Sequence, residues 1–199
     1  MTSDGNKQVE RGMTIAKLHE MFELDAVNGS LRWRERPIHH FKETPRRTAL
    51  HAMRRTNSAH AGKPAFTSKH QLGYLRAELD GRLWQAHRVV FALFHGRFPE
   101  GEVDHVNGNP ADNRPSNLRE TTHRENMRNS ARRYDNKSGH PGVTPRPGNK
   151  WRADIRGGAR RHLGTFNTYE EALAARKAAE KELGFHSNHG RSFNAAHHS

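Results

Sequence analysis

Residues 102–129 decide the fold, and they read EVDHVNGNPADNRPSNLRETTHRENMRN. An apolar residue leads into an Asp-His pair, Asp104 and His105, and a loop rich in Asn, Gly, Pro and Asp follows. Asn117 comes after this loop, and a polar segment compatible with a helix carries Asn126. The stretch therefore presents an acid, an imidazole and two amides, separated by turn-forming residues.

These residue types suit the hydrolysis of a phosphodiester bond. That reaction needs a nucleophilic water, a base that deprotonates it, and positive charge on the phosphate and the leaving oxygen. His105 suits the base because the unperturbed pKa of an imidazole lies near neutrality. Asp104 and the amide oxygen of Asn126 are the hard oxygen ligands that Mg²⁺ prefers, and Asn117 is placed to orient His105 by a hydrogen bond. The alternative is a plain Asn/Asp-rich turn with an exposed His105.

The ordered motifs are Val103-Asp104-His105, Gly108-Asn109, Asp112-Asn113-Arg114, Asn117-Leu118-Arg119 and Glu125-Asn126, preceded by Gly73-Tyr74, Asp80-Gly81 and His87-Arg88-Val89-Val90. Together they resemble the core of the His-Asn-His (HNH) endonucleases, closest to the phage- and intron-encoded homing branch. The resemblance implies a ββα-metal fold, in which a two-stranded hairpin and a helix surround one metal ion.

The resemblance also implies roles for single residues. His105 would be the general base, Asp104 and Asn126 the metal ligands, and Asn117 the central Asn of the family. Asn126 stands where the family name has its last His, a substitution that occurs in the homing branch and bears on metal preference. The ion expected is one divalent cation, Mg²⁺ or Mn²⁺. His87 is either part of the site wall or a structural residue.

Composition limits the classes of function. The chain has 199 residues, of which 32% are hydrophobic, so small units joined by polar loops are expected. Its net charge of +13 favours a polyanionic partner, which could be DNA, RNA or an anionic membrane. With the nuclease resemblance, the expected partner is double-stranded DNA. The absence of a long apolar run argues against a membrane. With no cysteine, neither a disulfide nor a cysteine-based zinc site is possible, and we expect no structural zinc and no organic cofactor.

The N-terminal third is predicted in four parts. Residues 1–12 are expected to be disordered, and their polar start lacks a signal sequence, which predicts a cytoplasmic protein. Residues 14–22 predict a helix capped by Thr14, and residues 22–33 a hairpin that turns at Asn28-Gly29, both serving mainly to pack. The basic stretch 34–71 is either a solvated, partly disordered linker or an arm that neutralises phosphates. Its histidines lack carboxylate-backed ligand spacing, so no metal is predicted there.

The middle of the chain is expected to brace the Asp-His stretch. Residues 73–85 alternate like a hairpin around Asp80-Gly81, and residues 86–95 predict a short apolar helix that ends at Gly96. Both are expected to form the floor of the site. The nuclease domain is therefore predicted over residues 72–130, with a linker over 131–139.

Residues 140–185 predict a second unit with three short strands and one helix. The turns are Pro147-Gly148-Asn149 and Gly157-Gly158, and Thr168 with Glu171 forms a capping box. Alternation places Trp151, Ala153 and Ile155 on one face of the middle strand and charged residues on the other. Trp151 and Ile155 are expected to be core beneath the helix. Residues 186–199 are expected to be a disordered tail.

This pattern resembles the Apetala-type domain of plant ethylene-response factors, versions of which occur fused to HNH endonucleases. The motifs that carry it are Gly142-Val143, residues 150–156, residues 162–166 and Glu170-Glu171-Ala172. Thr144, Gly148 and His162 depart from the plant pattern, so no sequence preference is carried over. The DNA-facing candidates are the charged and polar side chains of the sheet: Arg146, Lys150, Arg152, Asp154, Arg156, Arg160 and His162. The alternative is a solvated charged face.

The sequence therefore predicts a modular α+β protein with a ββα-metal core and a C-terminal antiparallel sheet packed on one helix. The expected function is that of a monomeric, phage- or mobile-element-encoded DNA endonuclease of the homing type. Two other classes remain open. One is a DNA-binding regulator with an inert nuclease-like core. The other is a protein that binds or cuts structured RNA, and the sequence shows no aromatic platform for stacking RNA bases that would support it.

Overall fold

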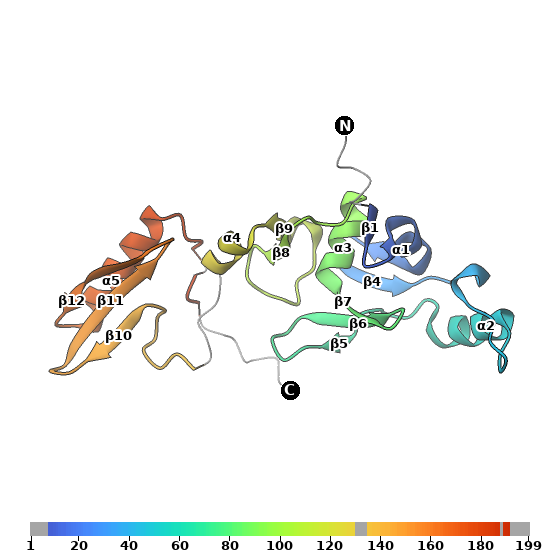
Figure 1. Cartoon of the computed structure of the whole chain (residues 1–199), viewed down its shortest axis with the longest axis horizontal. Coiled ribbons are helices and arrows are strands. Elements are labelled where there is room, and N and C mark those ends of the chain that lie inside the picture. The colour runs from blue at the N-terminus through green and yellow to red at the C-terminus, as the bar shows by residue number, and fades with distance from the viewer. Residues whose placement is uncertain (1–7, 130–134, 188, 192–199) are drawn as a thin grey trace. The chain divides into compact units, whose positions relative to one another are not determined.

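The computed structural model describes residues 8–129, 135–187 and 189–191. Contacts divide the chain into two compact units, Met1–Thr121 and Thr122–Ser199. Both units combine helices with antiparallel strands, so the α+β class is confirmed (Figure 1). The boundary between the units, after Thr121, lies inside residues 72–130, the range predicted for the nuclease domain. The limits of that domain stay a prediction. Among the described residues, no helix has the length and apolar character needed to cross a membrane.

The first unit is built from short elements in the order β1 (Val9–Glu10), β2 (Met13–Thr14), α1 (Ile15–Met21), β3 (Phe22–Asp25), β4 (Ser30–Trp33), η2 (Ile38–His40), α2 (Ala49–His60), β5 (Ser68–Lys69), β6 (Leu75–Leu79), β7 (Arg82–Gln85), α3 (Ala86–His95), β8 (Glu102–His105), η3 (Pro115–Asn117) and β9 (Leu118–Thr121). Its strands form three two-stranded antiparallel sheets, β1–β2, β3–β4 and β8–β9, and the three-stranded sheet β5–β6–β7.

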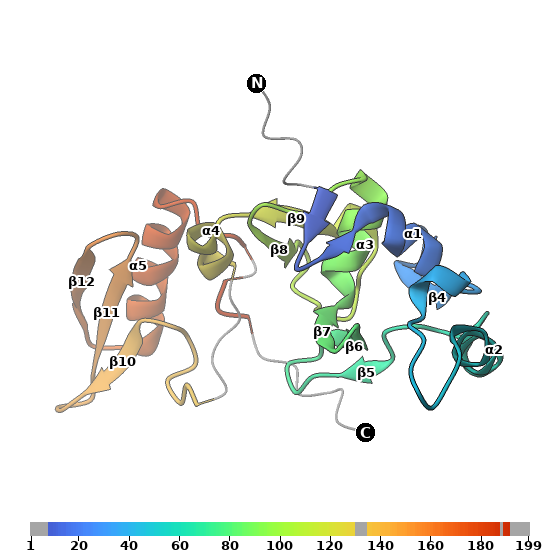
Figure 2. The ribbon, with the colours of Figure 1, turned by 45° about the vertical axis from the view of Figure 1, so that its right-hand side comes forward.

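Helix α3 is the centre of the first unit. Its residues Val89, Val90 and Ala92 are fully buried, and the helix contacts α1, β3, β4, β6, β7 and β8. Figure 2 shows α3 in green between α1 and the β8–β9 hairpin. Gly96 ends the helix in the left-handed conformation, at φ +66°. The hairpin and helix expected as a floor for the Asp-His stretch are therefore present, and α3 packs against β8.

The start of the chain is more ordered than predicted. Strand β1 pairs with β2, so the expectation of disorder is wrong for residues 8–12, while residues 1–7 lie outside the described part. Helix α1 is confirmed: the Thr14 hydroxyl accepts a hydrogen bond from the Lys17 amide at 3.1 Å. Ile15, Leu18 and Met21 form its buried face.

The turn of the β3–β4 hairpin differs from the prediction. Because Asp25 pairs with Ser30, the loop has four residues, 26–29, and Asn28-Gly29 is not a two-residue turn. The Asp25 carboxylate accepts hydrogen bonds from the backbone amides of Val27 and Asn28, at 3.0 and 3.1 Å, and this side-chain capping favours the longer loop.

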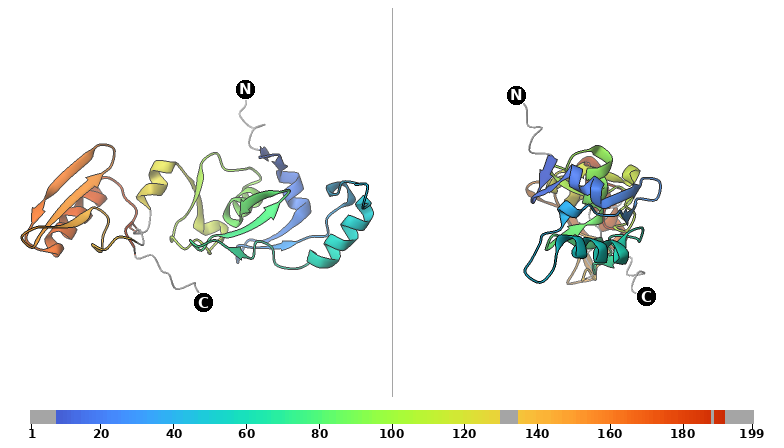
Figure 3. Two further views of the ribbon diagram at one scale, coloured as in Figure 1. Left: turned by 60° about the horizontal axis from the view of Figure 1, so that its bottom comes forward. Right: turned by 90° about the vertical axis from the view of Figure 1, so that its right-hand side faces the viewer.

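The basic stretch contains a helix that its sequence pattern did not indicate. Thr48 caps α2 by accepting a hydrogen bond from the His51 amide, at 3.2 Å. Only Ala52 is buried among the residues of α2, so the helix lacks the apolar stripe by which a helix is predicted. Asn57 fastens α2 to Arg36 by two hydrogen bonds, at 2.9 and 3.0 Å. The disordered-linker interpretation is wrong for residues 49–60, and Figure 3 shows α2 at one edge of the first unit.

The second unit contains α4 (His123–Arg128), β10 (Val143–Arg146), β11 (Lys150–Arg156), β12 (Arg160–Phe166) and α5 (Tyr169–Glu182). The three strands form an antiparallel sheet in that order, and α5 contacts all of them. The capping box of α5 is confirmed, because Thr168 and Glu171 exchange side-chain and backbone hydrogen bonds. Val143, Ala153 and Ala172 are fully buried between sheet and helix.

A β-bulge breaks the alternation expected for β11. Ala153 pairs with Gly164 but Asp154 pairs with His162, so the register shifts between them. Ala153, Asp154 and Ile155 are consequently buried in succession, and Asp154 does not stand out on an exposed face as predicted. Ile155 is core, as predicted, whereas Trp151 is only partly buried and packs edge-on against Tyr169.

Part of the expected tail is folded. The His186 amide donates to the Arg128 carbonyl at 3.2 Å, and Arg191 Nη1 donates to the Asn129 carbonyl at 2.6 Å. The disorder prediction is therefore wrong for residues 186, 187 and 189–191, and residues 188 and 192–199 lie outside the described part. Of the expected linker, residues 135–139 form a turn around Asn136 and residues 130–134 are not described.

Gly29→Ala should destabilise the first unit more than an ordinary glycine replacement. Gly29 has φ +67°, and a Cβ there would overlap the backbone of Asn113 and Arg114. Gly62 is the matched control, with φ +74° and open space where a Cβ would lie. We expect Gly62→Ala to lower the free energy of unfolding by about 1 kcal/mol, and Gly29→Ala by clearly more, in urea denaturation. Equal effects would contradict the close approach of the two loops.

Candidate active site

The candidate site is built on the β8–β9 hairpin. Val103 pairs with Glu120, Asp104 with Arg119 and His105 with Leu118. Val103 and Leu118 point into the core of the first unit. Residues 106–117 close the hairpin as a long loop that begins where His105 ends β8. Asp104 and His105 thus stand together at the end of a strand, as the sequence predicted.

His105 is held in place by Asn113. The His105 residue is 3% exposed, and its Nε2 lies 3.0 Å from the Asn113 side-chain oxygen. Because an amide oxygen only accepts, Nε2 of His105 is the donor of this hydrogen bond. In the neutral imidazole, the lone pair that can take a proton is then on Nδ1.

Two aromatic side chains surround the His105 ring. The His87 ring meets it edge-on at 5.1 Å between centroids, and the Tyr74 ring lies at 5.8 Å. Burial, with added repulsion from His105 and Arg88, lowers the pKa of His87 to about 3. His87 is therefore neutral near pH 7 and adds no charge beside His105. Its Nδ1 is buried and has no hydrogen-bond partner among the described residues.

Asp104 is a buried carboxylate and precedes His105 on β8. It is 8% exposed, and Arg119 donates to its Oδ2 from Nε and Nη2, at 3.2 and 2.9 Å. Both guanidinium contacts fall on one oxygen, and a carboxylate binds Mg²⁺ through either oxygen. As a hard oxygen donor beside an imidazole, Asp104 fits a ligand of a divalent ion.

Asn117 has a different set of contacts from the one expected. Its side-chain oxygen accepts from the Asn107 amide at 2.9 Å, and its Nδ2 donates to the Asn107 side chain and the Asp112 carbonyl, at 3.0 and 2.8 Å. The expected hydrogen bond to His105 is not among the contacts of the described residues. Asn117 instead fixes the loop, and Asn113 contacts the imidazole. The sequence analysis noted Asn113 as part of the Asp112-Asn113-Arg114 motif, but it did not predict the contact with His105.

Charge pairing shapes the same loop. Arg114 donates to Asp112 from Nε and Nη2, at 2.8 and 2.6 Å. The Arg114 hydrogen bonds lower the pKa of the Asp112 carboxyl to about 2. Asp112 also accepts from the Asn107 side chain at 2.8 Å, so it links two parts of the loop.

The hairpin is braced from behind by α3 and the segment that follows it. Arg97 forms an ion pair with Glu120 at 2.8 Å, and Glu120 also accepts from the Gly101 amide at 3.1 Å. Arg88 on α3 donates to the Gly101 carbonyl at 2.9 Å and pairs with Glu10 at 2.7 Å. These contacts fix the strand that carries Asp104 and His105.

Asn126 lies in the second unit, on α4. The helix begins with a capping box, in which Thr122 accepts from the Glu125 amide and Glu125 accepts from the Thr122 amide. Asn126 is partly buried. In the first unit, the structure joins His105 to the loop held by Asn117 through Asn113, and Asp104 precedes His105 on β8. Asn126 belongs to the second unit.

The charged face of the second unit is organised around Asp154. Arg152 pairs with its carboxylate at 2.9 Å, Arg160 at 2.9 Å and His162 at 3.1 Å. Burial acts to raise the pKa of Asp154, but the hydrogen bonds from these three side chains outweigh it and lower the pKa to about 2. Four of the seven predicted DNA-facing residues therefore form one cluster.

The remaining three predicted DNA-facing residues lie at the strand ends. Arg146 pairs across the sheet with Lys150, and Arg156 with Arg160. Arg146, Arg156 and Arg160 line a hollow of about 1100 Å³ in the second unit. The sheet thus gathers cations, but Asp154 is already paired with its neighbours.

Comparison with known families supports the nuclease interpretation for part of the chain. Residues 85–128 match the HNH endonuclease family, and this range contains Asp104, His105, Asn117 and Asn126. A search of curated proteins and a search of solved structures gave no match. The match supports an HNH nuclease domain over these residues, and HNH nucleases generally use a divalent metal and act on DNA.

Asn113→Asp should shift the pH dependence of any cleavage that relies on His105. A carboxylate at the Asn113 position would stabilise the protonated imidazole and raise its pKa, so the acidic limb of kcat/KM should move to higher pH by roughly one unit or more. Asn109→Asp is the matched control, because it adds the same charge to the loop and keeps an oxygen to accept from Ala111. Identical profiles for the two variants would contradict the Asn113–His105 contact.

Proposed function

We propose that this chain is a metal-dependent DNA endonuclease of the homing type. The observation that carries the proposal is His105, fixed by Asn113 at the end of β8 and adjacent to Asp104, within the residues that match HNH endonucleases. The net charge of +13 supports a polyanionic substrate.

The reaction is hydrolysis of one phosphodiester bond. Nδ1 of His105 accepts a proton from water as the water oxygen forms a bond to phosphorus. The bond from phosphorus to the leaving oxygen breaks, and that oxygen takes a proton. Asn113 keeps the His105 ring in the tautomer that has its lone pair on Nδ1, and Asn117 keeps the loop that carries Asn113 in shape. His87, neutral near pH 7, packs against the base without opposing its protonation.

Asp104 and Asn126 are the proposed ligands of the divalent ion, Mg²⁺ or Mn²⁺. When bound, the ion supplies positive charge to the phosphate and to the leaving oxygen. Arg119 keeps the Asp104 carboxylate oriented through its two contacts with Oδ2. The amide of Asn126 adds no charge, so the carboxylate of Asp104 supplies the negative charge that attracts the ion.

We further propose that the sheet of the second unit positions DNA. Arg152, Arg160 and His162 are all held by Asp154, so their N–H groups are pre-arranged for phosphate oxygens. In this proposal Asp154 spaces the cations and does not read bases. The basic segment 34–71, now with an ordered helix in it, adds further cations at the edge of the first unit.

One contact favours a second class of function, a DNA-binding regulator with an inert core. Arg119 already neutralises Asp104, and in a protein that binds no metal this ion pair would replace the cation. A regulator would retain the binding of DNA by the second unit and lack any cleavage that depends on His105.

His105→Ala should abolish cleavage and leave DNA affinity nearly unchanged, because the base is lost but the basic surfaces remain. His105 is buried, so His105→Gln, which nearly preserves the volume, should be tested beside it and checked for folding by thermal denaturation. His19→Ala, an exposed histidine on α1 outside the basic segment, is the control and should cut like the wild type. A folded His105→Gln variant that cuts at the normal rate would refute the proposed base.

Arg160→Ala should weaken DNA binding and lower the slope of log K against log salt by about one, as expected for one lost phosphate contact. Arg161→Ala is the control, since Arg161 lies on the same strand but pairs with Glu182 on α5, at 2.9 Å. Equal salt slopes in both variants, measured by fluorescence anisotropy, would argue against the sheet as a DNA surface.

A further inference from the structure

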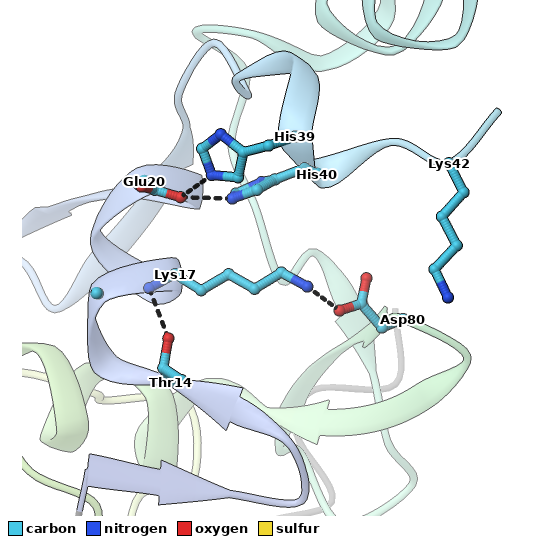
Figure 4. Close-up of a pocket in the computed structure, with 8 residues that line it drawn as sticks. Thr14, Lys17, Glu20, His39, His40, Lys42 and Asp80 are labelled. Atoms are coloured by element: carbon cyan, nitrogen blue, oxygen red, sulfur yellow. Dashed lines mark hydrogen bonds and ion pairs between the residues drawn. The ribbon is translucent and has the colours of Figure 1, made fainter. Parts of the chain in front are cut away.

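Three side chains far from β8 converge in the first unit. Nε2 of His39 lies 3.0 Å from Oε2 of Glu20, and Nε2 of His40 lies 2.6 Å from the same oxygen. The two imidazole rings meet edge-on, with centroids 4.8 Å apart. Figure 4 shows both rings turned toward the Glu20 carboxylate. Among the described residues, this is the one group of at least three His, Cys, Asp or Glu side chains with the spacing of a metal site.

The fold brings these residues together although the sequence separates them. Glu20 lies in the last turn of α1, and the histidines lie on η2, 19 and 20 positions further along. Glu35 and Glu43 are the acidic residues nearest to the histidine pair in the sequence, but the carboxylate that contacts both imidazoles is that of Glu20 on α1. The sequence analysis predicted no metal in residues 34–71 and no structural zinc, and it did not foresee that Glu20 joins the two histidines.

The donor set is that of a zinc-type site. Two imidazole nitrogens and one carboxylate oxygen are borderline ligands that suit Zn²⁺, whereas Mg²⁺ prefers oxygen alone. Ligands of one tetrahedral Zn²⁺ ion, each about 2.0–2.1 Å from it, stand about 3.3 Å from one another. The His–Glu distances of 3.0 and 2.6 Å need only a small opening to reach that spacing.

The surroundings leave room for a fourth ligand. The group lines a pocket of about 650 Å³ together with Lys17, Lys42 and Asp80. Asp80 is paired with Lys17 across this pocket (Figure 4). Three protein ligands with space beside them is an arrangement in which water completes the zinc coordination.

Metal binding would require a local change at Arg36. Its Nε lies 3.5 Å from Nδ1 of His40, and a His40 that ligates through Nε2 carries its proton on Nδ1. Two donors would then face each other, so Arg36 has to move away. The Arg36 guanidinium also lies over the Phe41 ring, 4.9 Å from its centroid, and this contact can be kept in a different rotamer.

We propose that Glu20, His39 and His40 form a site for a Zn²⁺-class ion, separate from the nuclease ion, that fastens η2 to α1. Residues 34–71 include α2 and carry much of the basic charge of the first unit. An ion bound by α1 and η2 would fix the start of this segment against the core. It would thereby set where α2 stands, without contact with the reacting phosphate.

The test is a titration of the metal-free full chain with Co²⁺, followed by visible absorption, and with Zn²⁺ in competition. Because the chain has sixteen histidines, the result depends on differences between variants. Glu20→Gln and His39→Ala each remove one ligand with a partly exposed side chain, at 42% and 62% exposure, so both should fold. His19→Ala, an exposed histidine on the same helix, is the matched control.

We expect wild type and His19→Ala to bind one tetrahedral ion that Mg²⁺ does not displace. Glu20→Gln and His39→Ala should bind it on the order of tenfold more weakly or worse. Zn²⁺ should also slow proteolysis and amide exchange of residues 34–41 in the wild type and in His19→Ala. Equal Co²⁺ affinity in all four proteins, or displacement by Mg²⁺, would overturn the proposal. No readout involves DNA cleavage, so the outcome is independent of the proposed nuclease function.

Discussion

The hydrogen bond between His105 Nε2 and Asn113 Oδ1 is the interaction on which the site depends. It joins the end of β8 to Asn113 in the loop of residues 106–117. The position of the His105 ring therefore depends on how firmly that loop is held. The loop is fixed by the Asn117 amide, by the Asp112–Arg114 pair and by the backbone of Gly29, which approaches Asn113 too closely for any side chain. The β3–β4 hairpin therefore supports the site without supplying a functional group.

The second constraint is that each buried carboxylate must be paired with a cationic side chain. Only 32% of its residues are hydrophobic, so buried carboxylates carry much of the organisation between elements. Asp104 and Asp154 each hold at least one arginine in place. Breaking such a pair leaves a buried charge without a partner, which costs more than the pair itself contributes. These carboxylates also leave the arginines in defined positions for an anionic substrate.

Local signals predicted much of the fold. The caps at Thr14 and Thr168, the apolar face of α3 and the strands of the second unit were readable, because each rests on neighbouring residues. Helix α2 was missed because it buries only Ala52, and the burial of Asp154 was missed because a bulge interrupts strand alternation. Asp104 and His105 were predicted as site residues by residue type, and their roles stay a prediction. The Asn113 contact and the Glu20–His39–His40 group were not predicted, since both depend on how distant segments fold together.

The central claim is that the β8–β9 hairpin carries a working hydrolytic site. The most direct measurement is incubation of supercoiled plasmid with the wild-type chain in Mg²⁺, in Mn²⁺ and in EDTA, with the products separated by gel electrophoresis. We expect conversion of the plasmid to nicked or linear DNA with either metal and none with EDTA. Intact plasmid under all three conditions, together with retained DNA binding, would contradict it and favour a regulator with an inert core.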